Sequence, residues 1–386
     1  MDTRRVLIVL SAASGWSRGI LRGFMRAAHE RGWTLLHYNP NSNLDWLTRE
    51  WQPVAAVVGP ELSDESLRQL AGVAIVSVTV DRSAQQIASV CPDEEAIATL
   101  ALRHLLGTGL RCVSTFRFDE SAFAVARERA FITQAKAAGA EVARGWGTVD
   151  VLPAQREEDP PGLIAWLQGL PKPCGIFTCT DSWGRTVSRY ARVAGLRVPE
   201  DLALIGADND VLECELMAPP LSSVMIPWQE VGKTAAQLVQ LALAGESIAG
   251  VCRLLEPVSV IARRSTDVLA IDDALVAKAV RWIRANSDRR LSVPMVARAV
   301  GGGRQRLERR FRRVLDRSVQ EEIRRARVEA AKSLLHTTRA PLADVAKRSG
   351  FSTAALLSVA FRRELGVPPG LYRRRIRQVL DSTQED

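Results

Sequence analysis

The sequence has few residues of the kinds that hold metals. Its 386 residues include six cysteines and four histidines, and no two cysteines form a Cys-x-x-Cys pair. A structural zinc site needs cysteine or histidine ligands in closely spaced pairs. We therefore expect free, mostly buried thiols, with no metal site and no cofactor.

Long hydrophobic runs are also missing. No apolar run reaches the roughly 18 residues needed to span a bilayer. The first apolar run, Val6–Leu10, is too short for a signal peptide and is typical of a strand. Because 47% of the residues are hydrophobic and 25% are charged, the composition is that of a globular protein of two or three domains. We expect a cytoplasmic protein that does not bind membranes.

The sequence lacks the partners that its one hydrolase-like motif would need. Residues Gly15–Gly19 match Gly-x-Ser-x-Gly, in which Ser17 would be the nucleophile. A triad in the usual chain order also needs a later histidine that belongs to the same domain. Only His37, His104 and His336 follow Ser17 at any useful distance, and His336 belongs to the basic C-terminal end of the chain. A triad in the usual order therefore lacks its base. There is no Walker A motif either. We expect a protein that is not an enzyme, and an esterase that uses Ser17 is the alternative.

The positive charge is concentrated at one end of the chain. Residues 268–386 hold 26 Lys and Arg against 13 Asp and Glu, a net charge of +13. Residues 1–267 hold 26 against 30, a net charge of −4. The C-terminal part therefore suits a polyanion such as DNA, and the N-terminal part does not.

Short apolar runs alternate with helical stretches over the first 260 or so residues. This alternation predicts an α/β fold of parallel sheets with helices on both faces, here as two lobes. We expect strands at 6–10, 33–38, 55–59, 74–80, 112–116, 175–179 and 202–206, and helices at 19–30, 64–71, 93–106, 121–138, 162–170 and 181–194.

The alternation stops near Arg263–Asp267, and only helices are expected from Asp272 onward. The segment contains no Gly-Ser or Pro run, which indicates a short linker. We expect a two-lobed ligand-binding domain over residues 1–264, a linker over 265–274, and an all-α domain over 275–386.

The all-α domain contains an internal repeat. The pattern Val-Ala-x-x-x-Gly starts at Val296 and again at Val345, 49 residues later. The pattern Leu-x3-Phe-x3-Leu starts at Leu307 and again at Leu357, 50 residues later. Two copies in register on a basic segment indicate a tandem pair of similar helical units.

Each copy has the features of a helix-turn-helix motif. Gly301 and Gly350 permit a positive φ in the turn, and the apolar residues bury one face of the second helix. The opposite face is left for a DNA major groove. We also expect Ser318 and Glu321 to form a capping box, and Pro341 to be a first helical residue. The free faces carry Arg304, Gln305, Arg306, Glu308, Arg309 and Arg312 in the first copy, and Thr353, Ala354, Ala355, Ser358 and Arg362 in the second.

This region resembles the DNA-binding domain of the AraC family. The matching residues are Ala297, Gly301, Leu307, Phe311, Ala331, Leu334–Leu335, Val345–Ala346, Gly350–Phe351, Phe361, Pro368 and Tyr372. The resemblance implies two recognition helices in adjacent major grooves. It implies base contacts by Gln305, Glu308 and Arg309 in the first groove and by Ala354, Ala355 and Ser358 in the second.

The sequence departs from this family at two places. Ala354 and Ala355 offer only methyl contact to thymine, and Val359 stands where the family often has Arg. Gly303 stands where a Ser or Thr N-cap is usual, which predicts a weaker cap for the first recognition helix. We therefore expect the first motif to set most of the sequence specificity.

The N-terminal part resembles the LacI and periplasmic sugar-binding family. The resemblance rests on Pro92–Asp93, Thr180–Asp181, Ile205–Asp210 and Pro220–Val224. It implies a ligand at the carboxyl ends of the strands, between two lobes. Sugars need polar partners for their hydroxyl groups and an aromatic face. The candidate ligand-binding residues are Arg18, Arg127, Asp181, Asp208, Trp16 and Trp183.

A LacI-type sensor that precedes an AraC-type reader is an unusual order. The combination resembles a family of sugar-responsive regulators over nearly the whole chain. It implies a pentose ligand such as D-xylose, a homodimer, double-stranded promoter or operator DNA and RNA polymerase as partners, and activation of pentose catabolism genes. The alternative that keeps DNA binding is an N-terminal domain that only dimerises.

Overall fold

The protein is described here from a computed structural model, which covers residues 4–38, 44, 47–147, 162–268, 271 and 273–380. Its contacts divide the chain into two units. The α/β unit comprises Met1–Leu105 and Arg111–Asp267, and the helical unit comprises Leu106–Leu110 and Val268–Asp386. Of the expected linker, residues 269, 270 and 272 lie outside the described residues, as do residues 381–386 of the expected C-terminal domain.

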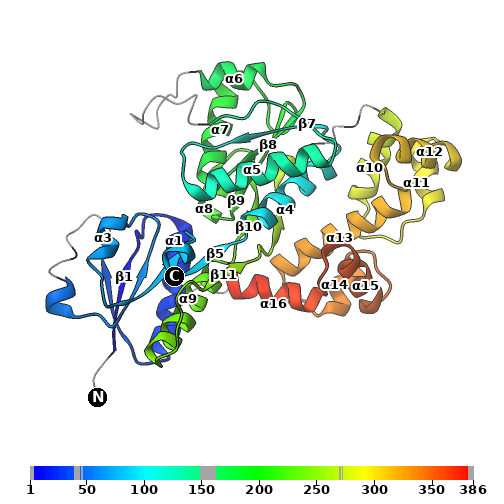
Figure 1. Cartoon of the computed structure of the whole chain (residues 1–386). Coiled ribbons are helices and arrows are strands. Elements are labelled where there is room, and N and C mark those ends of the chain that lie inside the picture. The colour runs from blue at the N-terminus through cyan, green and yellow to red at the C-terminus, as the bar shows by residue number, and fades with distance from the viewer. Residues whose placement is uncertain are drawn as a thin grey trace. The chain divides into compact units, whose positions relative to one another are not determined.

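The α/β unit is built on two six-stranded sheets, one in each lobe (Figure 1). All neighbouring strands are parallel except β10 and β12. The first sheet has the order β11(Cys252–Leu255), β5(Ala88–Pro92), β4(Ala74–Val78), β3(Ala55–Val58), β1(Arg5–Val9), β2(Thr34–Tyr38). The second has the order β12(Ser259–Ile261), β10(Ser222–Met225), β9(Leu202–Asp208), β8(Cys174–Thr178), β6(Cys112–Phe116), β7(Glu141–Val142). The prediction of a two-lobed, mainly parallel α/β domain is confirmed.

The chain crosses between the two sheets three times, after β5, after β10 and after β11. Backbone hydrogen bonds tie these crossings together. The N–H of Asp93 donates to the carbonyl of Leu255 at 2.9 Å, and the N–H of Val258 donates to that of Met225 at 2.8 Å. The crossings therefore form one bonded strip between the lobes.

The helices of the α/β unit begin at polar capping residues and bury one face against the sheets. In α1, the side chain of Ser14 accepts from the N–H of Ser17, which starts this helix four residues before the expected Gly19. The helices are α1(Gly15–His29), α3(Asp64–Arg68), α4(Glu94–Gly107), α5(Ala122–Ala137), α6(Leu163–Gly169), α7(Asp181–Val193), α8(Val211–Leu216) and α9(Trp228–Leu243). Short helical turns also occur at Leu47–Trp51, Ser83–Gln85 and Arg264–Thr266.

Helices α1 and α9 pack with their backbones in close contact. A Cβ atom at Gly232 would lie 2.0 Å from the carbonyl oxygen of Ile20, and one at Gly23 would lie 2.0 Å from that of Gln229. The two glycines therefore allow an approach that a side chain would prevent.

The expected strands and helices of this unit are present, with ends that shift by up to a few residues. The sequence patterns did not predict β5, β7, β10, β11, β12, α8 and α9. Strand β10 is Ser-Ser-Val-Met and β12 has only three residues, so neither carries a clear strand pattern. Five of the six cysteines are buried, Cys252 is partly buried, and all are free, as expected.

The helical unit repeats its helices at a spacing of 50 residues. Helix α12(Arg304–Leu315) corresponds to α15(Ala354–Leu365), and α13(Val319–Thr337) starts 50 residues before α16(Pro369–Leu380). The remaining helices are α10(Ala274–Ala285), α11(Val293–Val300) and α14(Leu342–Arg348). The tandem helix-turn-helix prediction is confirmed.

Local signals in this unit are confirmed with one exception. Gly301 and Gly350 have φ values of 74° and 76°, as their turns require. Ser318 and Glu321 form the capping box at the start of α13. The placement of Pro341 was wrong by one residue: it is the N-cap of α14, since its ψ of 151° is extended. No helix in the described part of the chain is long and apolar enough to cross a membrane.

Candidate ligand site and nucleic-acid interface

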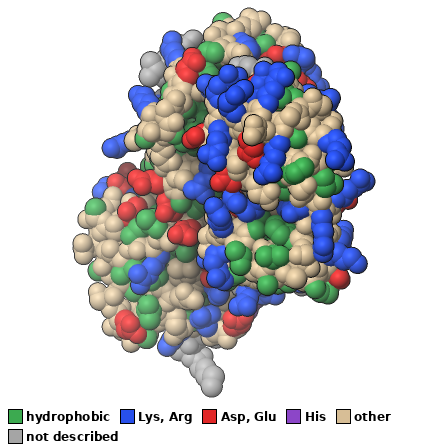
Figure 2. Space-filling model, turned by 90° about the vertical axis from the view of Figure 1, so that its right-hand side faces the viewer, with side chains coloured by type: hydrophobic (Ala, Val, Ile, Leu, Met, Phe, Trp, Pro, Cys, Tyr) green, Lys and Arg blue, Asp and Glu red, His purple; other side chains and the backbone are tan. Residues whose placement is uncertain are grey.

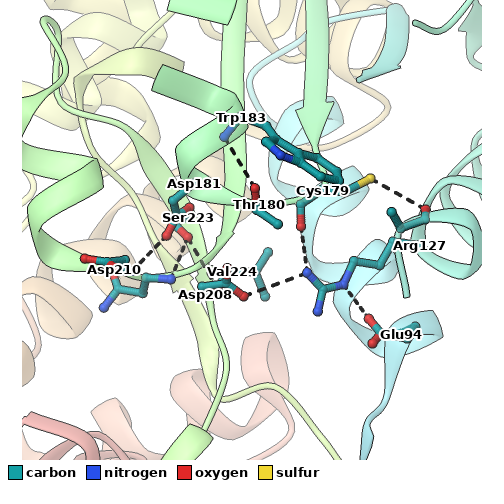
Figure 3. Close-up of polar contacts among 12 residues, drawn as sticks. Glu94, Arg127, Cys179, Thr180, Asp181, Trp183, Asp208, Asp210, Ser223 and Val224 are labelled. Carbon is teal, nitrogen blue, oxygen red and sulfur yellow. Dashed lines mark hydrogen bonds and ion pairs between the residues drawn. The ribbon is translucent and has the colours of Figure 1, made fainter. Parts of the chain in front are cut away.

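A buried arginine lies at the centre of a polar cluster in the α/β unit (Figure 3). Arg127, on α5, is 2% exposed. Its Nε donates to the carboxylate of Glu94, and its Nη1 donates to the carbonyl of Cys179 at 2.6 Å. The same Nη1 lies 3.8 Å from Oδ1 of Asp208. Arg127 thus joins the start of α4, the end of β8 and the end of β9.

Asp208 ends β9 in an uncommon backbone conformation. Its φ is 110° and that of Asn209 is 55°, both in the region that side chains rarely adopt. The turn is held by hydrogen bonds: Asn209 N–H donates to Ser223 Oγ at 3.0 Å, and Arg263 Nη2 donates to Asn209 Oδ1 at 2.9 Å. Such strain is found where structure is fixed for binding, and here it aims Asp208 at Arg127.

Asp181 is the first residue of α7 and lies next to this turn. Its Oδ2 accepts from the N–H of Asp210 at 2.8 Å. A Cβ atom at Gly206 would lie 2.2 Å from Oδ1 of Asp181, so the missing side chain makes room for the carboxylate. Asp181 is 1% exposed, and its hydrogen bond with the N–H of Asp210 holds the Asp208–Asp210 turn in place.

Burial shifts the pKa values of the groups in this cluster. It raises the pKa of Asp181 to about 7 and the pKa of Asp208 well above its usual range. It also raises the pKa of Glu94, although the charge of Arg127 acts in the opposite direction. For Arg127, burial lowers the pKa, but Glu94 and Asp208 together raise it above its ordinary value. The guanidinium group of Arg127 therefore stays charged, and the carboxyl groups of Glu94 and Asp208 both interact with it.

A pH dependence of stability follows from Asp181. Its pKa is about 7 when folded and near 3.8 when unfolded, so the folded state binds more protons between these values. The contribution of Asp181 to the free energy of unfolding therefore falls as the pH rises from about 4 to about 7. We expect Asp181→Asn to gain stability relative to the wild type as the pH is raised from 5 to 8, measured by urea unfolding.

The control for this prediction is Asp201→Asn. Its hydrogen bonds with Arg197 lower the pKa of Asp201 below 3.8, so the carboxylate is ionised in both states across this pH range. The difference between Asp201→Asn and wild type should not change from pH 5 to 8. A constant difference for Asp181→Asn as well would contradict the proposed protonation.

One aromatic ring packs against the arginine, and further rings lie at the start of α7 and of α1. The guanidinium carbon of Arg127 lies 4.9 Å from the ring centre of Phe123, which stacks on Trp183 with 6.1 Å between centres. In the other lobe, Trp16 lies 5.8 Å from Trp228, centre to centre. Trp16 and Trp183 are both partly exposed, which a stacking platform requires.

Four of the six expected ligand residues are therefore linked through contacts: Arg127, Asp208, Asp181 and Trp183. Arg18 and Trp16 lie together on the first turn of α1, where Arg18 Nη1 donates to the carbonyls of Ala12 and Ala13 at 3.1 and 2.7 Å. Glu94 and Phe123 also belong to this cluster and were not among the residues predicted from the sequence. The position of Glu94 directly after Pro92–Asp93 was the available signal.

The hydrolase-like motif forms the start of a helix. Ser17 is fully buried, and its Oγ donates to the carbonyl of Ser14 at 2.9 Å. The ring of His37 is engaged elsewhere, since its Nε2 lies 2.7 Å from the carbonyl oxygen of Leu10. The glycines and serines of this segment therefore serve the turn between β1 and α1.

The first recognition helix, α12, is strongly basic. Arg304, Gln305, Arg306, Arg309 and Arg312 are all exposed. Lys and Arg outnumber Asp and Glu on the face seen in Figure 2. Gly303 is the N-cap and makes no side-chain bond, as predicted. Glu308 has a structural contact: its Oε2 accepts from the N–H of Val319 at 3.3 Å, at the start of α13.

The second recognition helix, α15, has a different surface. Thr353 is its N-cap and accepts from the N–H of Leu356 at 3.2 Å. The hydroxyl of Ser358 donates to the carbonyl of Ala354 at 2.9 Å. Ala355 and Arg362 are exposed. The hydroxyl groups of Thr353 and Ser358 thus have partners within the helix.

The two units together define a class of protein. A buried polar cluster at the strand ends of a two-lobed α/β fold is typical of a small-molecule site. A basic tandem helix-turn-helix is a DNA reader. The chain is therefore organised as a ligand-responsive transcription regulator.

Comparisons with known proteins agree with this class. Residues 102–266 match the periplasmic binding protein-like domain model, and residues 296–375 match a helix-turn-helix domain model. The Xylose operon regulatory protein of Escherichia coli K12 is 27% identical over 385 residues, 96% of each chain. That of Haemophilus influenzae is 30% identical over 216 residues, and the match spans 56% of each chain.

Shorter relatives and solved structures give the same result. Regulatory protein SoxS of Salmonella typhimurium is 32% identical over 102 residues, which are 26% of this chain and 95% of SoxS. The solved structure titled xylose-binding transcription activator xylR matches with a TM-score of 0.61 at 25% identity, over 97% of this chain and 98% of that one. Over nearly its whole length the chain is similar to the Xylose operon regulatory proteins, and its periplasmic-binding-protein-like domain precedes a helix-turn-helix domain. These findings support the regulator over the esterase alternative.

Proposed function

We propose that this protein is a transcription activator that responds to a pentose such as D-xylose. The observation that carries the proposal is Arg127, a buried cation that connects the strand-end acids to the crossing between the lobes. The names of the full-length relatives support a sugar as the ligand.

The residues of the cluster have complementary roles in this proposal. Asp208 and Arg127 bond the sugar hydroxyl groups, because carboxylates accept and guanidinium groups donate. Trp183 and Trp16 contact the apolar faces of the ring. Asp181 holds the turn that carries Asp208, and Arg18 donates from the first turn of α1.

The same contacts suggest how binding reaches the rest of the sensor. Glu94 is the first residue of α4, directly after the chain leaves β5 for the second lobe. A hydroxyl that bonds Asp208 competes with Arg127 for that carboxylate, while Arg127 stays paired with Glu94. Such differential contact stabilises one arrangement of the lobes and shifts the population toward it.

The output side of the proposal is the helical unit. Arg304, Gln305, Arg306 and Arg309 of α12 reach base edges and phosphates, with Glu308 close by, while Thr353, Ala354, Ala355, Ser358 and Arg362 of α15 meet the second groove. We further propose that the protein works as a cytoplasmic homodimer on promoter DNA and recruits RNA polymerase.

Two measurements on the full chain test this function. D-xylose should raise the thermal midpoint of the wild type, whereas a panel of hexoses should raise it less. Arg309→Ala should weaken specific DNA binding by about 1–3 kcal/mol and leave the sugar response unchanged. The matched control is Arg129→Ala, an exposed arginine of the α/β unit, which should change neither.

The alternatives predict other results. If no sugar shifts the midpoint while DNA binding persists, the N-terminal domain only dimerises. If the protein hydrolyses esters and Ser17→Ala abolishes turnover, the esterase alternative holds.

A further inference from the structure

The two recognition helices present opposite chemistry at equivalent positions. Helices α12 and α15 have the same length and are 50 residues apart, so Arg306 corresponds to Leu356 and Arg309 to Val359. No residue from Phe351 to Phe361 is charged. The helix that should enter the second groove therefore has no cation on its first two turns.

The exposed side chains on the first two turns of α15 end in methyl groups. Leu356 is 53% exposed and Val359 is 68% exposed. Ala355 beside them is also exposed. The hydroxyl of Ser358 already donates to a carbonyl of the same helix, and Thr353 caps it. Contacts from this face are thus mainly apolar.

The surroundings of this face favour DNA as its occupant. The exposed cations Lys347 and Arg348 precede the turn into α15, and Arg362 and Arg363 follow on its last turn. The whole segment 268–386 has a net charge of +13. Cations at both ends of an apolar helix suit phosphates on either side of a groove, whereas an apolar protein partner would gain nothing from them.

We propose that α15 reads thymine through its C5 methyl group, with Val359 and Leu356 as the specificity-determining residues. In the major groove, thymine is the base that presents a methyl group, and apolar side chains are its natural partners. The proposal rests on the DNA-binding function above. It assigns hydrogen-bonded readout to α12 and apolar readout to α15.

The experiment begins with selection of operator sites from random DNA by the full chain with D-xylose present. Selections repeated with Arg309→Ala and with Val359→Ala show which positions each helix reads. In the site selected by the wild type, thymine at the Val359-dependent positions is then replaced by deoxyuridine. This change removes one methyl group from the DNA and leaves the protein and the base pair intact.

We expect each replacement to weaken wild-type binding roughly fourfold, because burial of one methyl group contributes about that much. In Val359→Ala or Leu356→Ala, the same replacement should have a smaller effect or none. The matched variant Arg309→Ala should keep the full thymine preference, since its guanidinium lies on the other helix.

Other outcomes would overturn the inference. Deoxyuridine that binds as well as thymine, or selected sites without thymine at those positions, would exclude methyl readout while leaving DNA binding in place. Variants of Leu356 and Val359 that lose transcription but keep operator affinity would show that the face binds a protein. If no sequence is enriched, the proposed DNA-binding function itself fails, and this inference with it.

Discussion

Replacement of Arg127 by Ala should lower the free energy of unfolding of the α/β unit by about 3–5 kcal/mol, because it leaves buried acids without their cation. Glu94 and Asp208 both face Arg127, and burial raises the pKa of each. The change also removes the hydrogen bond to the Cys179 carbonyl at the end of β8. Sugar binding should be lost with it.

Urea unfolding followed by tryptophan fluorescence measures this effect. Eight of the nine tryptophans precede residue 268, so the signal reports mainly on the α/β unit. Arg129→Ala, on the exposed side of the same helix, is the control and should cost little. Arg127→Lys should lose less than Arg127→Ala, since it keeps the charge without the planar fork. Equal midpoints for the Arg127→Ala and Arg129→Ala variants would refute a central role for Arg127.

Substitution of Gly350 by Ala should destabilise the helical unit more than the equivalent substitution Gly301→Ala does. Its φ of 76° costs an alanine about 1–2 kcal/mol. In addition, a Cβ would lie 2.5 Å from the carbonyl oxygen of Ser287 and 2.7 Å from that of Arg289. Such overpacking against backbone adds about 1–3 kcal/mol.

Gly301→Ala separates the two costs. Gly301 has nearly the same φ, 74°, but a Cβ there meets nothing within 4 Å. It should therefore cost only the backbone part. Circular dichroism during thermal unfolding gives both values, and DNA-binding assays should show a larger loss for Gly350→Ala. Equal losses would mean that the carbonyls of residues 287 and 289 move aside at no cost.

Several features of this protein are determined by local sequence. The glycine turns and the Ser318–Glu321 capping box each depend on residues within a few positions of one another. The same local patterns recur 49 and 50 residues later, and this repetition identifies the tandem motif directly. The charge difference between the two ends of the chain needs no coordinates. Strand ends such as Asp208 and helix starts such as Asp181 could be located because apolar runs mark where strands stop.

The tertiary structure decided which of these residues work together. Arg127 and Glu94 are 33 residues apart, and only the crossing from β5 to α4 makes them a pair. The burial of Asp181 beneath Gly206, and hence its raised pKa, depends on the packing of α7 against β9. Glu308 became a contact of α13 rather than a free base reader for the same reason. Residue type and spacing determined the kinds of site, whereas long-range packing set their partners, because desolvation and hydrogen-bond geometry exist only once the chain has folded.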